Sequence, residues 1–331
     1  MVQRRTTALT ALASLAALAG ALLVAPRGAG AAPLFPLPVT AVQPEPCPPP
    51  YHPPGPPPPP LAAPAVAEAA IPLAAAPARR HVNLAAISGK GIWVTPFPGA
   101  PANVAAVVAA ARAAGLQQIW IRTGSTHDGY YGAPTLARLL PAAHALGIDV
   151  IAWDFPTLSN PAADAARAAA TLASGIDGFS ADIEEHPEGT YDTARRVTDY
   201  LSLVRRAAGH RPVVATVPRP LSVSLTGFPY AAAAPYVDAF APMIYWSCNE
   251  PGVVTELALR ALNRLGRVAP IGQDYNMADE GGRVGLPSER EIWRFLDVAR
   301  RGGAIGASLY DLESGGATDL AALAAYPWTR R

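Results

Sequence analysis

Beyond residue 80 the chain alternates between two kinds of apolar pattern. Short continuous apolar runs have the length and composition of buried parallel strands. Between them lie longer alanine- and leucine-rich segments, several of which end at a glycine, such as Gly115, Gly147 and Gly175. Glycine in this position is a signal for a helix C-terminus. The chain is therefore expected to fold as strand–helix units in series.

The expected strands cover residues 91–94, 118–122, 149–154, 177–184, 212–217, 239–245, 268–275 and 306–311. The expected helices cover residues 102–114, 135–146, 162–174, 191–208, 253–265, 289–301 and 317–325. Ser288 and Glu291 form a capping box before the penultimate helix. The fifth unit is the weakest, because residues 221–234 contain proline and glycine and fit a loop as well as a helix.

Strand and helix alternate about eight times over roughly 250 residues, the count and length of a (β/α)₈ barrel, or TIM barrel. A doubly wound parallel sheet is the alternative. It is less favoured, because no glycine-rich nucleotide-binding fingerprint follows the first strand. We therefore expect an α/β protein with a (β/α)₈ barrel over residues 81–331.

The strand at residues 177–184 carries acids on one of its faces. Apolar side chains alternate there with Ser180, Asp182 and Glu184, so the polar set lies on one face of the strand. Buried acids are costly unless they are paired, hydrogen-bonded or neutralised. At the C-terminal end of the fourth strand of a barrel, these carboxylates would lie where such barrels keep their chemistry.

Residues at the ends of the other strands would face the same mouth. Carboxylates can transfer protons at a glycosidic oxygen, and aromatic rings stack on the C–H-rich faces of sugars. Both kinds recur at these ends, so the pattern indicates a carbohydrate substrate. The candidate substrate-binding residues are Arg122, Trp153, Asp154, Trp246, Gln273, Asp274, Tyr310 and Asp311, and Tyr245 lies at the end of the sixth strand among them.

Residues 177–184 resemble the fourth-strand signature of family 18 glycoside hydrolases, the chitinase-like enzymes, which is written D-G-x-D-x-D-x-E. Residues 243–245 resemble the start of that family's sixth-strand M-x-Y-D. The resemblance implies that Glu184 protonates the leaving oxygen. It also implies that Asp182 orients the substrate's acetamido group, whose oxygen attacks the anomeric carbon, and that Tyr245 hydrogen-bonds the same group.

Three positions depart from the family pattern. Ser180 replaces the first acid of the triplet, Trp246 follows Tyr245 in place of Asp or Asn, and Tyr310 stands where the family has a tryptophan. These departures indicate a diverged glycosidase, and they leave open a non-catalytic glycan-binding barrel. Asp182-Ile183-Glu184 also resembles the Asp-x-Glu of family 25 lysozymes, which are secreted muramidases acting on peptidoglycan.

A metal-dependent hydrolase is a further alternative, with Asp154, Asp182, Glu184 and His127 as ligands. Acids spread over several strands are common in glycosidases without a metal, so we expect no metal and no cofactor. The net charge is +1, and no basic cluster of the size needed for nucleic-acid binding is present. The expected protein is a monomer that acts on a carbohydrate.

The N-terminal residues have the order of an export signal. Arg4 and Arg5 precede an apolar run over residues 8–26, and small residues follow to Ala32. We expect a cleaved signal peptide over residues 1–32, with a retained anchor as the alternative, and a secreted or cell-envelope mature protein without a membrane span. Residues 33–80 are rich in proline and alanine and are expected to form a disordered linker.

The chain has two cysteines, Cys47 and Cys248, and their separation matches no metal-ligand spacing. In an exported protein they could form one disulfide. Two unrelated thiols are the alternative.

Overall fold

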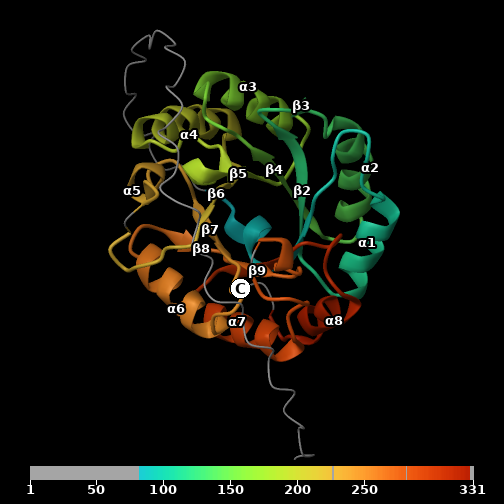
Figure 1. Ribbon diagram of the computed structural model, residues 1–331. Coiled ribbons are helices and arrows are strands. Elements are labelled where there is room, and N and C mark those ends of the chain that lie inside the picture. Colours follow the sequence, from blue (N-terminus) through green and yellow to red (C-terminus); the bar gives the residue numbers. More distant parts are fainter. Residues whose placement is uncertain (1–81, 226, 281, 329–331) are drawn as a thin grey trace, which may run out of the picture. The chain divides into compact units, whose positions relative to one another are not determined.

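A computed structural model describes residues 82–225, 227–280 and 282–328. The expected signal peptide and linker, residues 1–80, lie outside these ranges. The described chain forms a closed ring of parallel strands surrounded by helices, as Figure 1 shows. The eight ring strands are β1 (Gly89–Val94), β2 (Gln118–Ser125), β4 (Asp149–Phe155), β5 (Gly178–Asp182), β6 (Val213–Pro218), β7 (Ala239–Ile244), β9 (Ile271–Gln273) and β10 (Gly306–Tyr310).

The ring closes because β1 pairs with both β2 and β10, all in parallel register. A short strand, β3 (Gly129–Tyr130), adds antiparallel to the end of β2, and β8 (Arg267–Val268) pairs with β7. The expected (β/α)₈ barrel is therefore confirmed. No helix in the described ranges is long and apolar enough to cross a membrane.

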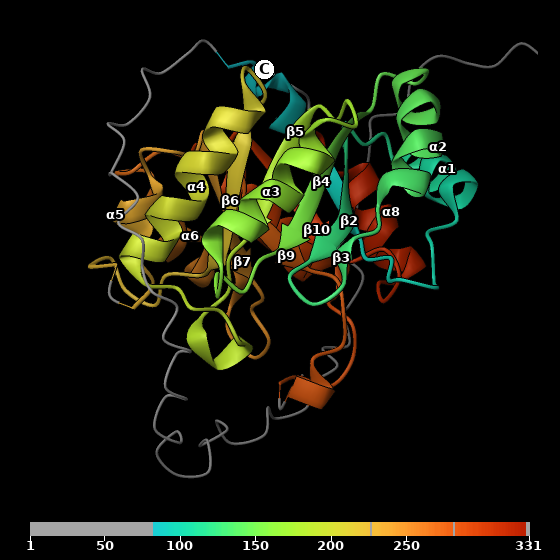
Figure 2. The same ribbon diagram turned by 90° about the horizontal axis from the view of Figure 1, so that it is seen from above.

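The helices form the outer layer, and Figure 2 shows α3 and α4 covering β4–β6. The capping box of Ser288 and Glu291 is present at the start of α7. The helices are α1 (Val104–Ala113), α2 (Ala133–His144), α3 (Pro161–Leu172), α4 (Ala194–Ala208), α5 (Tyr230–Ala233), α6 (Pro251–Leu262), α7 (Glu289–Arg301) and α8 (Ala317–Ala325). Short 3₁₀ turns are η1 (Leu84–Ile87), η2 (His186–Glu188) and η3 (Ala278–Glu280).

Three element boundaries differ from those expected. The fourth strand ends at Asp182, so Glu184 lies in the loop that follows it. The seventh strand is broken into β8 and β9 around Pro270, which has no backbone N–H to donate to a ladder. The fifth helix is a single turn, α5, because the preceding segment is a loop that contains proline and glycine.

Strand alternation divides the core into two layers. Odd-numbered apolar residues of β5, such as Phe179 and Ala181, pack outward against the helices. A separate cluster fills the inside of the barrel and includes Trp93, Trp120 and Trp153. The rings of Trp93 and Trp120 stack with centroids 5.0 Å apart and planes 13° apart. The barrel is thus packed with side chains and is not a pore.

The N-terminal end of the barrel is closed. The 3₁₀ turn η1 places Ala86 and Ile87 in the inner cluster, and its ribbon is the short blue-green helix near the centre of Figure 1. At the same end, the buried Lys90 ammonium donates to the carbonyl oxygens of Leu323, Ala324 and Tyr326 at 2.8, 2.8 and 3.1 Å. These bonds satisfy carbonyls at the C-terminus of α8. A substrate site is therefore expected at the opposite end.

Candidate active site

Strand alternation decides which of the predicted site residues face the mouth. In β4, Trp153 belongs to the inner cluster, so the next residue, Asp154, points outward toward α3. In the same way, Tyr245 packs against the inner cluster and Trp246 belongs to the outer one. The sequence placed both members of such adjacent pairs in the site. The structure brings only one member of each of these pairs to the mouth.

Aromatic side chains line the mouth on the side of β7, β9 and β10. Tyr245 lies 5.4 Å from Tyr275 and 5.8 Å from Tyr310, measured between ring centroids. Tyr310 also contacts Trp153 at 6.4 Å. Burial raises the pKa of Tyr245 well above its usual range, so its hydroxyl stays protonated and can donate a hydrogen bond. These rings provide faces on which a sugar can stack.

Tyr275 was absent from the predicted site. It follows Gln273, the last residue of β9, by two positions, and a period-two count from Gln273 would have placed it on the same face. The signal was therefore present, but the seventh strand is interrupted and its end could not be located from the sequence.

Asp182 is the last residue of β5 and is 7% exposed. Its Oδ1 atom is buried and has no hydrogen-bond partner in the described structure. Burial raises the pKa of Asp182 well above its ordinary value, the negative charge of Glu184 adds to this, and Arg122 opposes it. An acid with an unfilled acceptor at the mouth of the barrel is suited to receive a donor from a ligand.

Ser180 lies two residues before Asp182 on the same strand face. Its hydroxyl is hydrogen-bonded to the hydroxyl of Thr216 on β6, with 2.8 Å between the two oxygens, and both residues are buried. The serine that departs from the family signature is thus tied to the neighbouring strand. It takes no part in a chain of acids below Asp182.

Glu184 lies in the loop two residues beyond β5 and is largely shielded from solvent. Burial raises the pKa of Glu184 to about 7, and the charges of Glu188, Glu185 and Glu280 contribute to the same shift. The first two of these acids come from η2 and the segment just before it, and the third comes from η3. A carboxyl group with this pKa keeps its proton near neutral pH and can act as a general acid.

Arg122 lies on the inner face of β2, in register with Trp153 of β4. Its guanidinium carbon lies 4.7 Å from the ring centroid of Phe97 and 5.4 Å from that of Trp153. Cation–π contact of this kind favours a charged guanidinium close to an aromatic face. Arg122 therefore brings a positive charge into the mouth near Asp182.

The other predicted residues are occupied by structural contacts. Asp154 is fully buried and holds Arg167 of α3 through two bonds of 2.6 and 2.7 Å. Trp246 is 1% exposed and packs on Phe295 of α7, with 5.7 Å between ring centroids. These two side chains join the barrel to its helices and are not placed to touch a sugar.

Gln273, Asp274 and Asp311 organise the loops around β9 and β10. The Gln273 amide accepts from the backbone N–H of Ser247 at 2.8 Å and donates to the carbonyl of Tyr275 at 2.9 Å. Asp311 accepts from the Thr95 hydroxyl at 2.6 Å. Asp274 is 1% exposed, and burial raises its pKa to about 9, with hydrogen bonding to Asp319 of α8 adding to the shift.

The three acids and one histidine considered as metal ligands are not gathered. The carboxylate of Asp154 is ion-paired with Arg167, and His127 lies on the exposed loop after β2. Within the described ranges, no group of three or more His, Cys, Asp or Glu side chains is arranged to hold a metal ion.

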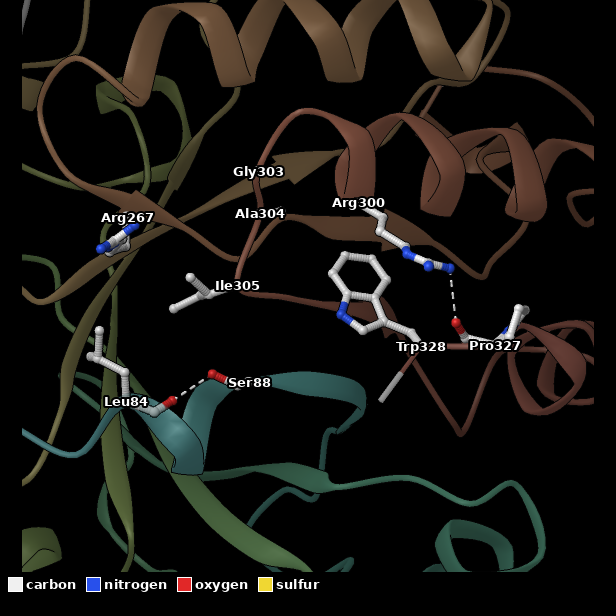
Figure 3. A pocket seen from close by; sticks show the side chains of 9 residues that line it. All are labelled: Leu84, Ser88, Arg267, Arg300, Gly303, Ala304, Ile305, Pro327 and Trp328. Atoms are coloured by element: carbon white, nitrogen blue, oxygen red, sulfur yellow. Dashed lines mark hydrogen bonds between the residues drawn. The ribbon is translucent and has the colours of Figure 1, made fainter. Parts of the chain in front are cut away.

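A cavity of about 330 Å³ lies at the opposite end of the barrel, and Figure 3 shows it from close by. Hydrogen bonds at its edge join Arg300 to the carbonyl of Pro327 at 3.0 Å and Ser88 to that of Leu84 at 2.7 Å. Its described lining residues include no carboxylate, and it lies at the end of the barrel opposite the acid pair. The lining residues are Leu84, Ser88, Arg267, Arg300, Gly303, Ala304, Ile305, Pro327 and Trp328.

The sequence matches no protein-family model and no curated protein. Solved structures do share the fold. The spore cortex-lytic enzyme SleL of Bacillus megaterium QM B1551 superposes with a TM-score of 0.56 and 11% identity over 77% of each chain. A chitinase from Chromobacterium violaceum ATCC 12472 superposes with a TM-score of 0.53 and 14% identity, over 71% of this chain and 98% of the other.

A GH18 chitinase from Pseudoalteromonas aurantia is also similar, with a TM-score of 0.50 and 12% identity over 68% of this chain and 94% of the other. At such low identity the likeness is one of fold. The chain therefore has the parallel eight-stranded barrel that is found in chitinases and in SleL, and the chitinase-like resemblance is confirmed at that level.

Proposed function

We propose that this protein is a glycoside hydrolase that cleaves a polysaccharide or cell-wall glycan, with Glu184 as the general acid. The observation that carries the proposal is the pair of shielded acids at the mouth of the barrel. Glu184 has a pKa of about 7, and Asp182 next to it has a buried oxygen without a partner. Chitinases and SleL with the same fold support the reaction class.

The two acids have different roles in the proposed reaction. Glu184 gives its proton to the glycosidic oxygen while the bond from that oxygen to the anomeric carbon breaks. The oxygen of the substrate's acetamido group attacks the same carbon. Asp182 Oδ1 accepts the acetamido N–H, which fills its unoccupied acceptor, and the Tyr245 hydroxyl donates to the acetamido oxygen. Water then opens the cyclic intermediate and returns a proton to Glu184.

The test is turnover by Glu184→Gln and Asp182→Asn proteins on chitin oligomers, peptidoglycan and neutral α- and β-glycans. Glutamine keeps the shape of the glutamate but cannot release a proton, so Glu184→Gln should lose roughly 10²–10⁴-fold in turnover while still folding and binding glycan. Near-normal activity of this variant on the best substrate would show that another centre performs the reaction.

The Asp182→Asn variant separates two mechanisms. If its loss is confined to N-acetylated sugars, the acetamido group is the nucleophile. An equal loss on neutral glycans would mean that Asp182 itself acts in a two-carboxylate reaction. A protein that binds glycans but shows no turnover in its wild-type form would instead be a glycan-binding barrel.

We also propose that the protein works outside the cytoplasm. The order of Arg4-Arg5, an apolar run and small residues supports export. Cys248 is disulfide-bonded, and disulfides persist mainly in oxidising compartments. N-terminal sequencing of the native protein should find a start near Ala32, whereas a full-length membrane-bound product would contradict cleavage.

A further inference from the structure

The guanidinium of Arg122 has no acceptor in the described structure. It makes no hydrogen bond or ion pair with any residue of the described ranges, and its Nε atom is buried. Two other covered arginines of the described ranges hold a carboxylate: Arg167 lies 2.6 Å from Asp154, and Arg205 lies 2.5 Å from Asp238. Arg122 alone of these three is directed into the mouth and left unpaired.

A second unfilled donor lies next to it. Trp153, which is in register with Arg122 on the adjacent strand, has a buried indole N–H without an acceptor. The two side chains are in contact, since the guanidinium carbon lies 5.4 Å from the Trp153 ring centroid. Buried donors are normally satisfied, and neighbouring exceptions at a binding site call for an acceptor from outside the chain.

From these contacts we infer that the mouth binds a sugar carrying a carboxylate, and that Arg122 is its specificity-determining residue. The inference rests on the proposed glycan-cleaving function and names its substrate class. A guanidinium fork matches a planar carboxylate with two parallel N–H···O bonds. Phe97 and Trp153 hold the guanidinium, and Arg122 is only half-buried, so solvent can reach part of its side chain.

Arg122 has two possible roles beside the nearby acids: to offset the charge of Asp182 or to bind a carboxylate of the substrate. Burial and Glu184 raise the pKa of Asp182 and the charge of Arg122 opposes that rise, but no ion pair joins Arg122 to Asp182. If Arg122 served only to offset Asp182, its removal would weaken every substrate equally. A carboxylate-binding role instead predicts a loss that depends on the charge of the sugar.

Binding to the Glu184→Gln protein tests the inference without requiring turnover. The probes are hyaluronan oligosaccharides and peptide-free peptidoglycan strands, each compared with its carboxyl-reduced form by calorimetry. The acidic form of one polymer should bind about 10- to 100-fold tighter than its reduced form, the range typical of charged hydrogen bonds. A preference seen with hyaluronan would identify the carboxylate as that of a uronic acid. A preference seen with peptidoglycan strands would identify it as that of a lactyl ether.

Adding Arg122→Met should weaken binding of the acidic form by a similar factor and bring the ratio of affinities close to one. Arg122→Lys keeps the positive charge but loses the two-pronged guanidinium, so it should retain only part of the preference for the acidic polymer. This lysine variant provides the test if Arg122→Met does not fold. Arg206→Met, in the exposed last turn of α4, removes the same charge at the end of the barrel opposite the mouth and should keep the ratio.

An equal loss for acidic and reduced forms would overturn the inference, as would a wild-type preference for neither form or no binding of any probe. Lack of turnover by the wild-type protein, together with a charge-dependent affinity that needs Arg122, would refute the hydrolase proposal alone. Turnover without any preference for acidic sugars would refute this inference alone.

Discussion

Burial is the largest cause of the raised pKa of Glu184, and three further acids contribute to it. The carboxyl group acts as an acid only while it is protonated. With Glu184 as the proposed general acid, activity is expected to fall as the pH rises through about 7, the pKa of its carboxyl group. Residues that never touch substrate can thus set the working pH of the site.

Replacing Glu188 with glutamine tests this dependence. The change removes the neighbouring negative charge that contributes most, after burial, to the raised pKa of Glu184, so that pKa should fall. The basic limb of the kcat profile on the best substrate is expected to move to lower pH. Glu256→Gln, on the exposed face of α6, is the matched control and should leave the limb where it is. A limb that stays in place in Glu188→Gln would mean that another group controls it.

Elements are joined by the residues that point away from the mouth. Asp154 ties β4 to α3 through Arg167, which also bonds Asp164 at 2.9 Å. Breaking a buried pair by removing one partner costs about 3–5 kcal/mol. We therefore expect Asp154→Asn to lower the free energy of unfolding by about this amount.

Denaturant unfolding measures that change, and glycan affinity shows whether Asp154 also binds substrate. Because its carboxylate faces α3, the affinity of the folded protein should differ little from that of wild type. The exposed pair of Glu256 and Arg260 is the control, and Glu256→Gln should cost less than about 1 kcal/mol. A stable Asp154→Asn protein with weak glycan binding would restore Asp154 to the site.

The second connection is between the end of β9 and α8. Asp274 binds its proton more tightly in the folded protein, where its pKa is about 9, than in the unfolded chain, where a carboxyl has its ordinary value of 3.8. The resulting stabilisation is fully present below about pH 4 and is lost as the pH rises through about 9. Ionisation would leave a buried charge beside Asp319.

Asp274→Asn cannot ionise and still offers a donor to Asp319. Denaturant unfolding between pH 5 and about pH 9 should show wild-type stability falling with pH more steeply than that of the variant. Glu289→Gln, at the exposed first residue of α7, is a suitable control for loss of one acid. If the free energy of unfolding of wild type and Asp274→Asn changed equally with pH, the proton on Asp274 would not be a source of stability.

At the scale of the whole chain, the described barrel has its own closed ring and core. Residues 33–64 contain few apolar side chains at regular spacing, so we expect them to contribute little to folding. Deleting residues 1–76, together with Cys248→Ser to remove the thiol, should leave the thermal midpoint within a few degrees. Cys248→Ser in the full-length chain is the control, and a large drop caused by the deletion alone would show that the segment stabilises the barrel.

Cysteine chemistry provides an independent test. Cys248 lies on the exposed loop after β7 and is disulfide-bonded, and Cys47, outside the described residues, is the only other cysteine. Thiol titration of the intact unfolded protein should find no reactive thiol before reduction and two after it. Free thiols before reduction would contradict the pairing.

The repeating order of strands and helices was readable from the sequence. Period-two alternation in β5 placed Asp182 on the inner face, and runs ending in glycine marked the helices. Prediction was weakest where a strand has no clear end. Residues 268–275 were read as one strand, but Pro270 divides it, and Tyr275 was missed.

The adjacent pairs show what else the sequence could not decide. Trp153 is followed by an acid, Asp154, and Tyr245 by a second aromatic residue, Trp246. By residue type alone, either member of each pair could bind a sugar at the strand end. The two faces of a barrel strand differ in what they contact: one faces the barrel interior and the other faces the surrounding helices. The outward members, Asp154 and Trp246, contact Arg167 and Phe295. Both of these partners come from helices further along the chain.

The sequence by itself determined the barrel and the location of its acid pair, because strand and helix periods are local properties of the chain. The tertiary structure alone decided which side chains face the mouth of the barrel and how tightly the acids there hold their protons. The pKa of Glu184, the unfilled oxygen of Asp182 and the unpaired guanidinium of Arg122 all depend on groups from different strands and loops. Burial and pairing exist only once the ring has closed and brought those groups together.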